Sequence, residues 1–474
     1  MSQMNRIFLN CAIFALFFIL ISPNTCAADS GALRAGAAKI DITPDAKSIP
    51  KPFTSILDHL YARAIFLDNG HSRAVLISID VGGTDDATWE KLAKEISLQF
   101  NVPIPNILMS VTHTHNAIFG GGPPGLGGAP DPNLPAFRTK AENGVLEAVR
   151  QAQSKLKPAR IGAGEGMLYL NVNRDAINEQ TRLWAQEPNL DYPSDKTLAV
   201  VKIEDLSGNL IAVYVNYAMH AISLFLDGKV SGDFPGAAER YIERLYSDNA
   251  VALWTSGAAG DQNPLYVRAN NVLVGARLQA VMDAEHVDVD TAVMRSMFVG
   301  SAAGDKAPVD PVALEQSLQL VQSMGQLTAE EAIRVMKNIR IMNTDVAIDG
   351  AQQTVTCSAR RRTNSGREGA SGTYENDSNP VNIRIGALRV GDIALGSANA
   401  ELYNMMGQRV KQGSKFRNTI MVTLANGSAN SGYVPTDDAF GRNTFQVLGS
   451  RLKPGCAENA IVHGIDDLIE KMKD

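Results

Sequence analysis

The sequence predicts an α/β fold in which helices and strands form layers around a mixed sheet. Segments with the apolar patterns of strands are interleaved with segments of helical spacing along the 474 residues. No internal repeat is visible, and no linker separates a second domain. With 45% hydrophobic and 20% charged residues, the chain has enough apolar material for one large core or two joined ones.

The first 27 residues have the features of a signal peptide. Arg6 is their only charged side chain, and the apolar run over residues 7–21 is too short for a convincing membrane span. Small residues at 26–28 suit signal peptidase, so we expect cleavage there and export to the periplasm or the extracellular space. A lipid anchor on Cys26 is the alternative, although residues 23–25 form a poor lipoprotein box.

Residues 30–474 are expected to form a single domain that begins with strands. Alternating residues predict a strand over 38–44, ended by Pro44. Apolar strands over 61–67 and 73–80 are joined by Asp68-Asn69-Gly70, a sequence typical of a hairpin turn. The two apolar strands and the turn between them predict a β-hairpin near the start of the mature chain.

The next segments alternate between helix and strand. Helical spacing predicts a helix over 86–100, and a short apolar strand follows over 107–111. Residues 120–132 are rich in glycine and proline and therefore predict a loop. A helix is expected over 134–156, where Pro135 is tolerated in the first turn.

The remaining elements continue this alternation. Residues 360–379 are polar and glycine-rich, which predicts a mobile loop or flap. The other predicted elements are hairpins over 198–217 and 381–395, helices over 235–249, 267–289, 310–337 and 401–411, and strands over 251–255 and 419–424.

Charge and cysteine content restrict the classes of function. The net charge of −6 argues against general nucleic-acid binding, which requires a basic face. After removal of the signal, Cys357 and Cys456 remain, and two cysteines in an exported chain often form a disulfide. The alternative is two buried free thiols. Neither cysteine lies in a CxxC spacing, so thiolate metal binding is not expected.

Two strand ends carry histidines. His113-Thr114-His115 ends the strand over 107–111, and residues i and i+2 of an extended segment point to the same side, so both rings can face one pocket. One ring can instead bind a metal while the other acts as an acid/base, and two partly exposed loop histidines are a further reading. His220 also follows an apolar strand, where ligand sites of α/β sheets collect, or it is a core histidine bonded to the backbone.

A third segment, residues 255–264, runs from a strand into a loop of small residues that contains Asp261. It is either a plain tight turn or a loop whose backbone amides approach a substrate.

Several landmarks keep their order from about residue 34 to residue 450. They are the strand over 34–44, Tyr61-Ala62-Arg63-Ala64, His113-Thr114-His115, residues 171–174, Ser231-Gly232-Asp233, Ala400-Glu401 with Met406-Gly407, and residues 431–436 around Tyr433. With these landmarks the chain resembles the neutral (non-lysosomal) ceramidase family. The resemblance implies a layered mixed-sheet catalytic domain. Because the chain stops at Asp474, we expect it to lack the C-terminal β-sandwich domain of the well-known ceramidases.

The resemblance implies a site with one catalytic zinc ion. Its ligands carry over onto His113, His220, Glu401 and Tyr433. Two imidazoles and a carboxylate are good zinc ligands, whereas a tyrosine oxygen is less common.

The resemblance also implies roles for residues around the ion. It makes His115 an acid/base or hydrogen-bond donor, places Arg174 near the substrate carbonyl oxygen and lets Asp261 orient a ligand histidine. The implied reaction is attack by a zinc-activated water, stabilisation of the oxyanion and protonation of the leaving nitrogen.

Three positions depart from the family pattern and are expected to contact the substrate. Asn263 stands where the family has a serine that was once proposed as a nucleophile, and Phe445 stands where it has a second tyrosine. The segment that begins at Asn116 also differs from the family loop.

We therefore expect a secreted zinc-dependent amidohydrolase that cleaves a linear amide bond of an N-acyl, ceramide-like or other small substrate. The alternatives are a zinc-dependent esterase or lactonase, and a non-catalytic binding protein that retains the fold. Neither nucleic acid nor a transmembrane segment of the mature chain is expected. Contact with a membrane surface and the oligomeric state are left open by the sequence.

Overall fold

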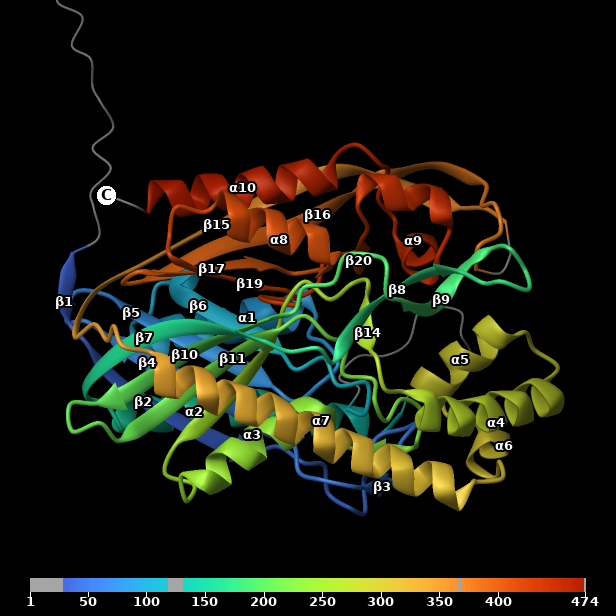
Figure 1. Ribbon diagram of the computed structural model, residues 1–474, viewed down its shortest axis with the longest axis horizontal. Helices are drawn as coiled ribbons and strands as arrows, with labels where there is room; N and C mark the ends of the chain where they lie inside the picture. Colours follow the sequence, from blue (N-terminus) through green and yellow to red (C-terminus); the bar gives the residue numbers. More distant parts are fainter. Residues whose placement is uncertain (1–28, 118–130, 365–367, 473–474) are drawn as a thin grey trace, which may run out of the picture.

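The computed structural model describes residues 29–117, 131–364 and 368–472 (Figure 1). The predicted signal peptide, Cys26 and nearly all of the predicted loop over 120–132 lie outside these residues. In the described part of the chain, no helix combines the length and the apolar character that a bilayer span requires.

The larger of two main sheets has eight strands, in the spatial order β13-β11-β10-β7-β2-β4-β5-β6. Neighbouring strands are antiparallel except at the two edges, where β11 pairs with β13 and β5 with β6 in parallel. Their bounds are Arg34–Asp41 (β2), Tyr61–Asp68 (β4), Arg73–Ile79 (β5), Ile107–Val111 (β6), Lys157–Met167 (β7), Thr197–Asp205 (β10), Leu210–Tyr217 (β11) and Val251–Ser256 (β13).

The smaller main sheet has five strands in the order β1-β15-β16-β17-β19. Its longest strands, β15 and β16, form one antiparallel hairpin. The bounds are Ser30–Ala32 (β1), Asp345–Arg362 (β15), Tyr374–Val390 (β16), Ile393–Ala398 (β17) and Asn418–Val422 (β19).

The two sheets pack face to face and are covered by helices on their outer sides (Figure 1). Leu67 and Leu76 of the larger sheet belong to the same buried apolar cluster as Leu388 and Leu395 of the smaller sheet. Removal of these side chains from water is the main stabilising contribution of the interior. The covering helices are α1 (Asp86–Phe100), α2 (Leu134–Ser154), α3 (Asp233–Leu245) and α7 (Pro311–Asn338) on the larger sheet, and α8 (Asn404–Gly413) and α10 (Ala457–Lys471) on the smaller one.

Short strands and helices lie at one end of the two sheets. Two small strand groups, β14-β8-β9 and β18-β20, carry part of the candidate site described below, namely Arg174, Asn263, Glu401 and Tyr433. The remaining elements of the described chain are β3 (Ser55–Ile56), β8 (Asn171–Ile177), β9 (Trp184–Asn189), β12 (Lys229–Val230), β14 (Gln262–Pro264), β18 (Glu401–Leu402), β20 (Tyr433–Val434), α4 (Arg268–Glu285), α5 (Val289–Phe298), α6 (Ala302–Asp305) and α9 (Phe445–Gly449), with 3₁₀ turns at Asp437–Arg442 and, at the opposite end before β6, at Ile104–Asn106.

The layered α/β prediction is confirmed, but two predicted elements have other bounds in the structure. Of the flap expected over 360–379, residues 360–362 and 374–379 belong to β15 and β16, with Arg362 opposite Tyr374. The described residues between them lie outside the strands, as a loop prediction requires. Polar residues that face water on the paired strands were mistaken for part of this loop. The helix expected over 267–289 is interrupted, because His286 adopts a left-handed conformation (φ 54°) and Asp288 then caps α5.

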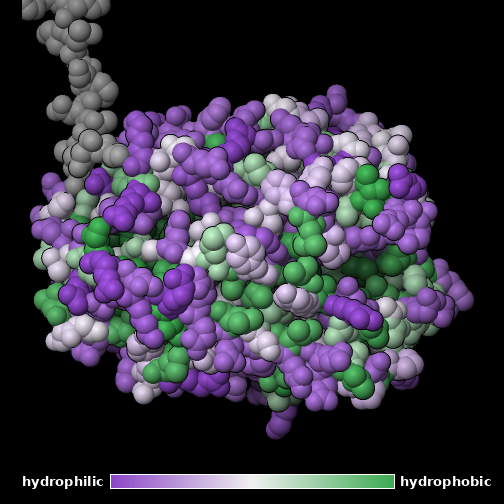
Figure 2. All heavy atoms as spheres, in the orientation of Figure 1, coloured by the Kyte–Doolittle hydropathy of each residue, from purple (hydrophilic) through white to green (hydrophobic). Residues whose placement is uncertain are grey.

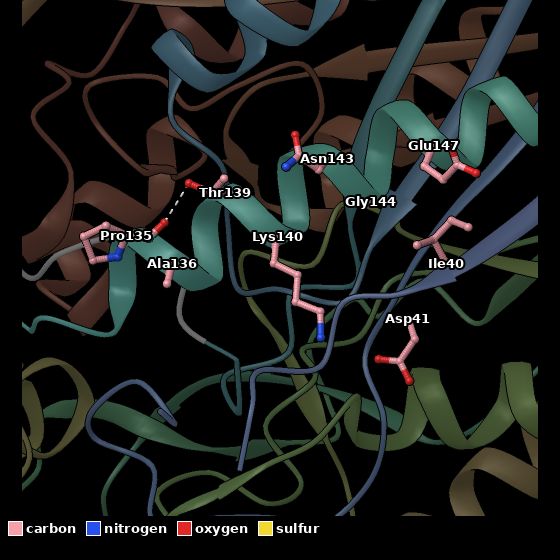
Figure 3. A pocket seen from close by; sticks show the side chains of 9 residues that line it. All are labelled: Ile40, Asp41, Pro135, Ala136, Thr139, Lys140, Asn143, Gly144 and Glu147. Atoms are coloured by element: carbon pink, nitrogen blue, oxygen red, sulfur yellow. Dashed lines mark hydrogen bonds between the residues drawn. The ribbon is translucent and has the colours of Figure 1, made fainter. Parts of the chain in front are cut away.

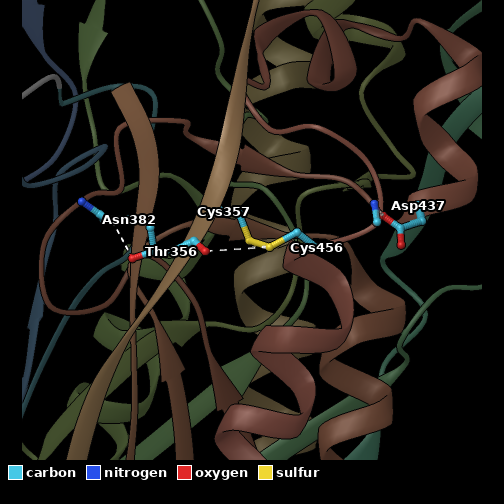
Figure 4. Close-up of a disulfide and its surroundings, with 6 residues drawn as sticks. Thr356, Cys357, Asn382, Asp437 and Cys456 are labelled. Atoms are coloured by element: carbon cyan, nitrogen blue, oxygen red, sulfur yellow. Dashed lines mark hydrogen bonds between the residues drawn. A yellow bond between two sulfur atoms is a disulfide. The ribbon is translucent and has the colours of Figure 1, made fainter. Parts of the chain in front are cut away.

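The predicted disulfide between Cys357 and Cys456 is present (Figure 4). Cys357 lies on β15 and Cys456 directly precedes α10, so the bond fastens the outer helix to the smaller sheet. The cysteines are 99 positions apart in the sequence.

Removal of this disulfide is expected to lower the free energy of unfolding by about 3 to 5 kcal/mol, because a loop of roughly 100 residues is no longer closed in the unfolded chain. The measurement is urea unfolding of the oxidised protein and of the Cys357→Ala/Cys456→Ala variant. A difference below about 1 kcal/mol would contradict a stabilising role.

Candidate metal centre

Two histidine-bearing segments lie side by side at the ends of β6 and β11. His113 and His115 follow β6, and His220 follows β11. Thr114 forms an isolated parallel bridge with Ala221, and the His115 N–H donates to the Ala221 carbonyl at 3.1 Å. These backbone contacts hold the three imidazole rings in one region.

The backbone at His113 differs from the expected extended conformation. Its φ is 60°, in the left-handed region that non-glycine residues rarely adopt. The two rings nevertheless converge, with 3.3 Å between the Nε2 atoms of His113 and His115. A left-handed non-glycine residue is a strained feature that is common at functional sites.

Glu401 enters the site from a strand and not from the predicted helix over 401–411. It lies on β18, opposite Tyr433 of β20, and its N–H donates to the Gly432 carbonyl at 2.9 Å. This pairing keeps the backbone extended, so α8 begins only at Asn404. The same pairing places the carboxylate and the phenol next to each other.

The Glu401 carboxylate meets two of the histidines. Its Oε2 atom lies 3.0 Å from His220 Nε2 and 3.4 Å from His113 Nε2. Four ligands at about 2.0–2.1 Å around a tetrahedral ion are about 3.3–3.4 Å apart, which is close to these separations. The three side chains therefore fit a shared divalent ion.

The other ring nitrogens show that the ligand atoms are available. His113 Nδ1 lies 2.5 Å from the Gly82 carbonyl oxygen, and His220 Nδ1 lies 3.1 Å from the Gln262 carbonyl oxygen. A carbonyl can only accept, so Nδ1 must donate in both rings and each neutral ring turns its Nε2 lone pair toward Glu401. Lone pairs that face a carboxylate need a positive charge between them, which a metal ion or a proton on Nε2 can supply.

Burial and charge set the protonation of the cluster. Burial and the neighbouring Arg174 cation lower the pKa of His220 to about 4. Burial also lowers the pKa of His115 well below its usual value, and the neighbouring histidines add to this shift. Burial opposes ionisation of Glu401, but His113 holds the pKa of this carboxyl well below its usual range. Burial lowers the pKa of His113, but the Glu401 charge outweighs this effect and raises it above its usual value. The metal-free site therefore holds neutral His115 and His220 beside an ionised Glu401, and a metal ion would take the place of the proton that Glu401 favours on His113.

Within the described residues, the three histidines are the set whose nitrogen atoms lie close enough together to hold an ion, all within 4.8 Å of one another. His115 thus joins His113 and His220 as a side chain able to reach the ion, although the sequence suggested an acid/base role for it. Glu401 and Tyr433 border the same space from β18 and β20.

Arg174 and Tyr433 form a second part of the site. The buried Arg174 side chain lies over the Tyr433 ring at 5.5 Å, and that ring stacks on His220 with 6.4 Å between centroids. Arg174 donates to Asn263 Oδ1 at 3.1 Å and to Gln186 Oε1 at 3.2 Å. Burial and the Glu401 charge raise the pKa of Tyr433, so its phenol keeps its proton and remains a hydrogen-bond donor.

Two predicted roles are wrong. Asp261 does not orient a histidine, because its carboxylate accepts from Asn404 N at 2.8 Å and from Asn173 Nδ2 at 2.9 Å. It therefore holds the start of α8. Asn116 does not face a substrate, because its fully buried amide donates to Asp227 Oδ1 at 2.8 Å and to the Leu224 carbonyl at 3.0 Å.

Other residues of the site were not found by sequence reasoning. The carbonyls of Gly82 and Gln262 orient the rings, but any residue type supplies a carbonyl, so sequence gives no signal for them. Phe225 packs edge-on against His115 with 5.6 Å between centroids. At the other end of the site, Phe445, which was expected to contact the substrate, packs against Tyr433 with 6.0 Å between ring centroids.

An open groove of about 740 Å³ along α2 is a separate feature (Figure 3). It is lined by Ile40, Lys140 and Glu147 among others, and it contains none of the predicted site residues. Lys140 donates to the Thr43 carbonyl at 2.5 Å, so its ammonium group is already used. The predicted catalytic residues therefore lie at the histidine cluster and not in this groove.

Comparison with known proteins gives independent evidence of the family to which the sequence is similar. Residues 50–308, more than half of the chain, match the sequence model of the family described as neutral/alkaline non-lysosomal ceramidase, N-terminal. Neutral ceramidase A of Dictyostelium discoideum is 27% identical over 195 residues, which cover 39% of this chain and 27% of that protein. Neutral ceramidase of Pseudomonas aeruginosa is 25% identical over 287 residues, which cover 56% of this chain and 41% of that protein.

The fold is shared with a solved structure. The crystal structure of neutral ceramidase from Pseudomonas aeruginosa superposes with a TM-score of 0.66 at 18% identity, covering 92% of this chain and 74% of that one. In sequence, the chain matches between 27% and 41% of the length of the curated relatives.

Proposed function

The chain belongs to the neutral/alkaline non-lysosomal ceramidase family, and on this basis we propose that it is a zinc-dependent hydrolase that cleaves the amide bond of an N-acyl, lipid-like substrate. The observation that carries this proposal is the convergence of His113, His220 and Glu401 with their free ligand atoms facing one point. The predicted signal peptide and the disulfide support an exported protein.

The metal ligands in this proposal are His113 Nε2, His220 Nε2 and Glu401 Oε2, with Tyr433 as the fourth side chain. Two imidazoles and a carboxylate favour zinc over the hard cations magnesium and calcium, which prefer oxygen ligands alone. A zinc ion bound there would polarise the substrate carbonyl and lower the pKa of a water molecule.

Tyr433 and Arg174 are proposed to stabilise the negative charge that develops on the carbonyl oxygen. The Tyr433 phenol is protonated, and Arg174 is fixed by Asn263 and by the Gly260 carbonyl at 2.5 Å. Donors that are already oriented before the reaction stabilise an oxyanion without a reorganisation cost. Loss of one such donor typically lowers kcat by about 10²–10³-fold.

His115 is proposed to move the proton. Its Nε2 atom lies 3.3 Å from His113 Nε2, which places it to accept a proton from the attacking water and to deliver it to the leaving nitrogen. An amide nitrogen leaves poorly as an anion, so this transfer is required for amide cleavage. Asn263 carries no nucleophilic oxygen and faces Arg174, which supports attack by water and not by a side chain.

The proposal is tested with N-dodecanoyl sphingosine and a matched dodecanoyl ester. Zinc-loaded protein is expected to cleave the amide, to lose this activity after chelation and to regain it with one equivalent of zinc per chain. Cleavage of the ester alone would replace the amidase by an esterase. Zinc binding without cleavage of either substrate would favour a binding protein.

A further inference from the structure

The segment over 221–228, directly after His220, forms a fixed wall beside the metal centre. The Leu224 N–H donates to Asp233 Oδ2 at 3.0 Å, and the Phe225 carbonyl accepts from Asn270 Nδ2 of α4 at 3.1 Å. Asn116 donates to Asp227 from the other side at 2.8 Å. The backbone of this segment is therefore held on three sides.

The wall keeps its Asp227 carboxylate within its own hydrogen bonds and places the Phe225 ring against His115 of the centre. The Asp227 carboxylate accepts from Asn116 Nδ2 and from the Lys229 N–H at 2.9 Å, so it is already satisfied. Phe225 and Leu226 stay half-buried, whereas Leu224 is fully buried. Leu226 has a φ of 60°, a costly conformation for leucine that persists because its surroundings fix it.

The aromatic rings of the site form a row with chemically different ends. His115 contacts Phe225, His220 lies between His115 and Tyr433, and Tyr433 contacts Phe445. The Tyr433 end also carries the polar groups of Arg174, Asn263 and Gln186. At the other end, the side chain that packs against His115 is the apolar Phe225 ring.

The two ends of the row lie against different elements. The Asn270 bond places Phe225 against α4, and the Gln186 bond places Arg174 against β9. Figure 2 shows a hollow with hydrophobic surface between β9 and α5, in the orientation of Figure 1. In an N-acyl sphingosine the acyl arm is hydrocarbon alone, whereas the amine arm carries hydroxyl groups next to the amide, and these two arms match the two ends of the row.

We propose that Phe225 contacts the acyl chain of the substrate and sets its length preference, while the amine arm lies at the Arg174 end. This inference rests on the proposed amide hydrolysis. Removal of an apolar wall reduces the gain from each added methylene group, and such a gain is about tenfold or more in a closed hydrophobic pocket.

The test compares wild type with Phe225→Ala and Phe225→Leu, and uses Phe445→Ala as the matched control from the other end of the row. Substrates are acetyl, hexanoyl and dodecanoyl amides of sphingosine. In wild type, kcat/KM is expected to rise with acyl length. Phe225→Ala is expected to lower the dodecanoyl-to-acetyl ratio by about tenfold, Phe225→Leu by less, and Phe445→Ala to leave it within about twofold.

An unchanged ratio in Phe225→Ala, or a ratio that falls in Phe445→Ala instead, would overturn the inference.

Calorimetric titration of zinc-loaded protein with dodecanoate and acetate gives a readout without catalysis. If wild type cleaves none of the amides, the proposed function fails, but Phe225→Ala is still expected to weaken dodecanoate binding about tenfold relative to acetate. Equal dodecanoate affinities of wild type and Phe225→Ala would overturn the inference, whether or not the amides are cleaved. Circular dichroism checks that each variant is folded.

Discussion

Glu401→Gln is expected to reduce amide hydrolysis by at least about a thousandfold while the protein stays folded, a loss of about 4 kcal/mol of transition-state stabilisation. Glutamine keeps the shape of the side chain but removes the charge that binds the ion. In the metal-free protein, its amide N–H can donate to the Nε2 atoms of His113 and His220, which now face a carboxylate 3.4 and 3.0 Å away.

This substitution separates metal binding from stability. Wild type is expected to gain melting temperature when zinc is added, because an ion that binds only the folded state stabilises it. Glu401→Gln is expected to lose this gain without a lower melting temperature of its metal-free form. His463→Ala, at an exposed position on α10, is the control that should behave as wild type. Wild-type zinc affinity in Glu401→Gln would contradict the ligand assignment.

Arg63→Met is expected to lower the free energy of unfolding by about 3 to 5 kcal/mol at neutral pH. The Arg63 side chain is fully buried and pairs with Asp80 and Glu239 at 2.9 Å and with Glu243 at 3.3 Å. Without the guanidinium, the three buried carboxyl groups keep only the Lys39 ammonium, 2.8 Å from Glu243, and the weaker attraction of Arg240 on Asp80 among the described residues. An uncompensated buried charge is far more costly than a missing surface contact.

The pH dependence of the Arg63→Met defect follows from the same cluster. Burial raises the pKa of Asp80, and it raises that of Glu239 well above its usual value, against the attraction of Arg63. Without Arg63 both rise further, so the folded state holds more protons than the unfolded state above about pH 4, and stability falls as pH rises. The defect is therefore expected to be larger at pH 8 than at pH 5 in urea unfolding.

Two control variants test whether the Arg63→Met defect comes from the buried cluster. Arg361→Met removes an exposed ion pair with Glu375 and is expected to cost less than about 1 kcal/mol. Glu239→Gln in the Arg63→Met background is expected to recover part of the loss, because one uncompensated carboxyl is removed. A defect no larger than that of Arg361→Met would show that the buried cluster is not held together by Arg63.

Local sequence signals predicted an element well where the residues that determine it are close together in the sequence. Asp68-Asn69-Gly70 joins β4 to β5 as expected, and α1 has the predicted bounds. The signals failed where pairing partners are distant and exposed. On the far half of the β15–β16 hairpin, the Arg360 guanidinium lies 3.8 Å from the centre of the Tyr374 ring. Such cross-strand contacts leave no periodic apolar pattern in the sequence.

The candidate site shows a similar division. His113, His220 and Glu401 come together as the resemblance implied, but the sequence alone gives no distance between segments this far apart. Asn116 and Asp261 were misassigned because a polar residue near a histidine need not face the same pocket. Asn116 instead fixes the segment over 221–228, and Asp261 fixes the start of α8.

The most direct test of the central claim is anomalous diffraction at the zinc absorption edge from crystals of zinc-loaded protein. The account predicts one strong anomalous peak about 2.0–2.2 Å from His113 Nε2, His220 Nε2 and a Glu401 carboxylate oxygen. A zinc-loaded crystal without a peak between these three side chains, or with its peak at other residues, would contradict it.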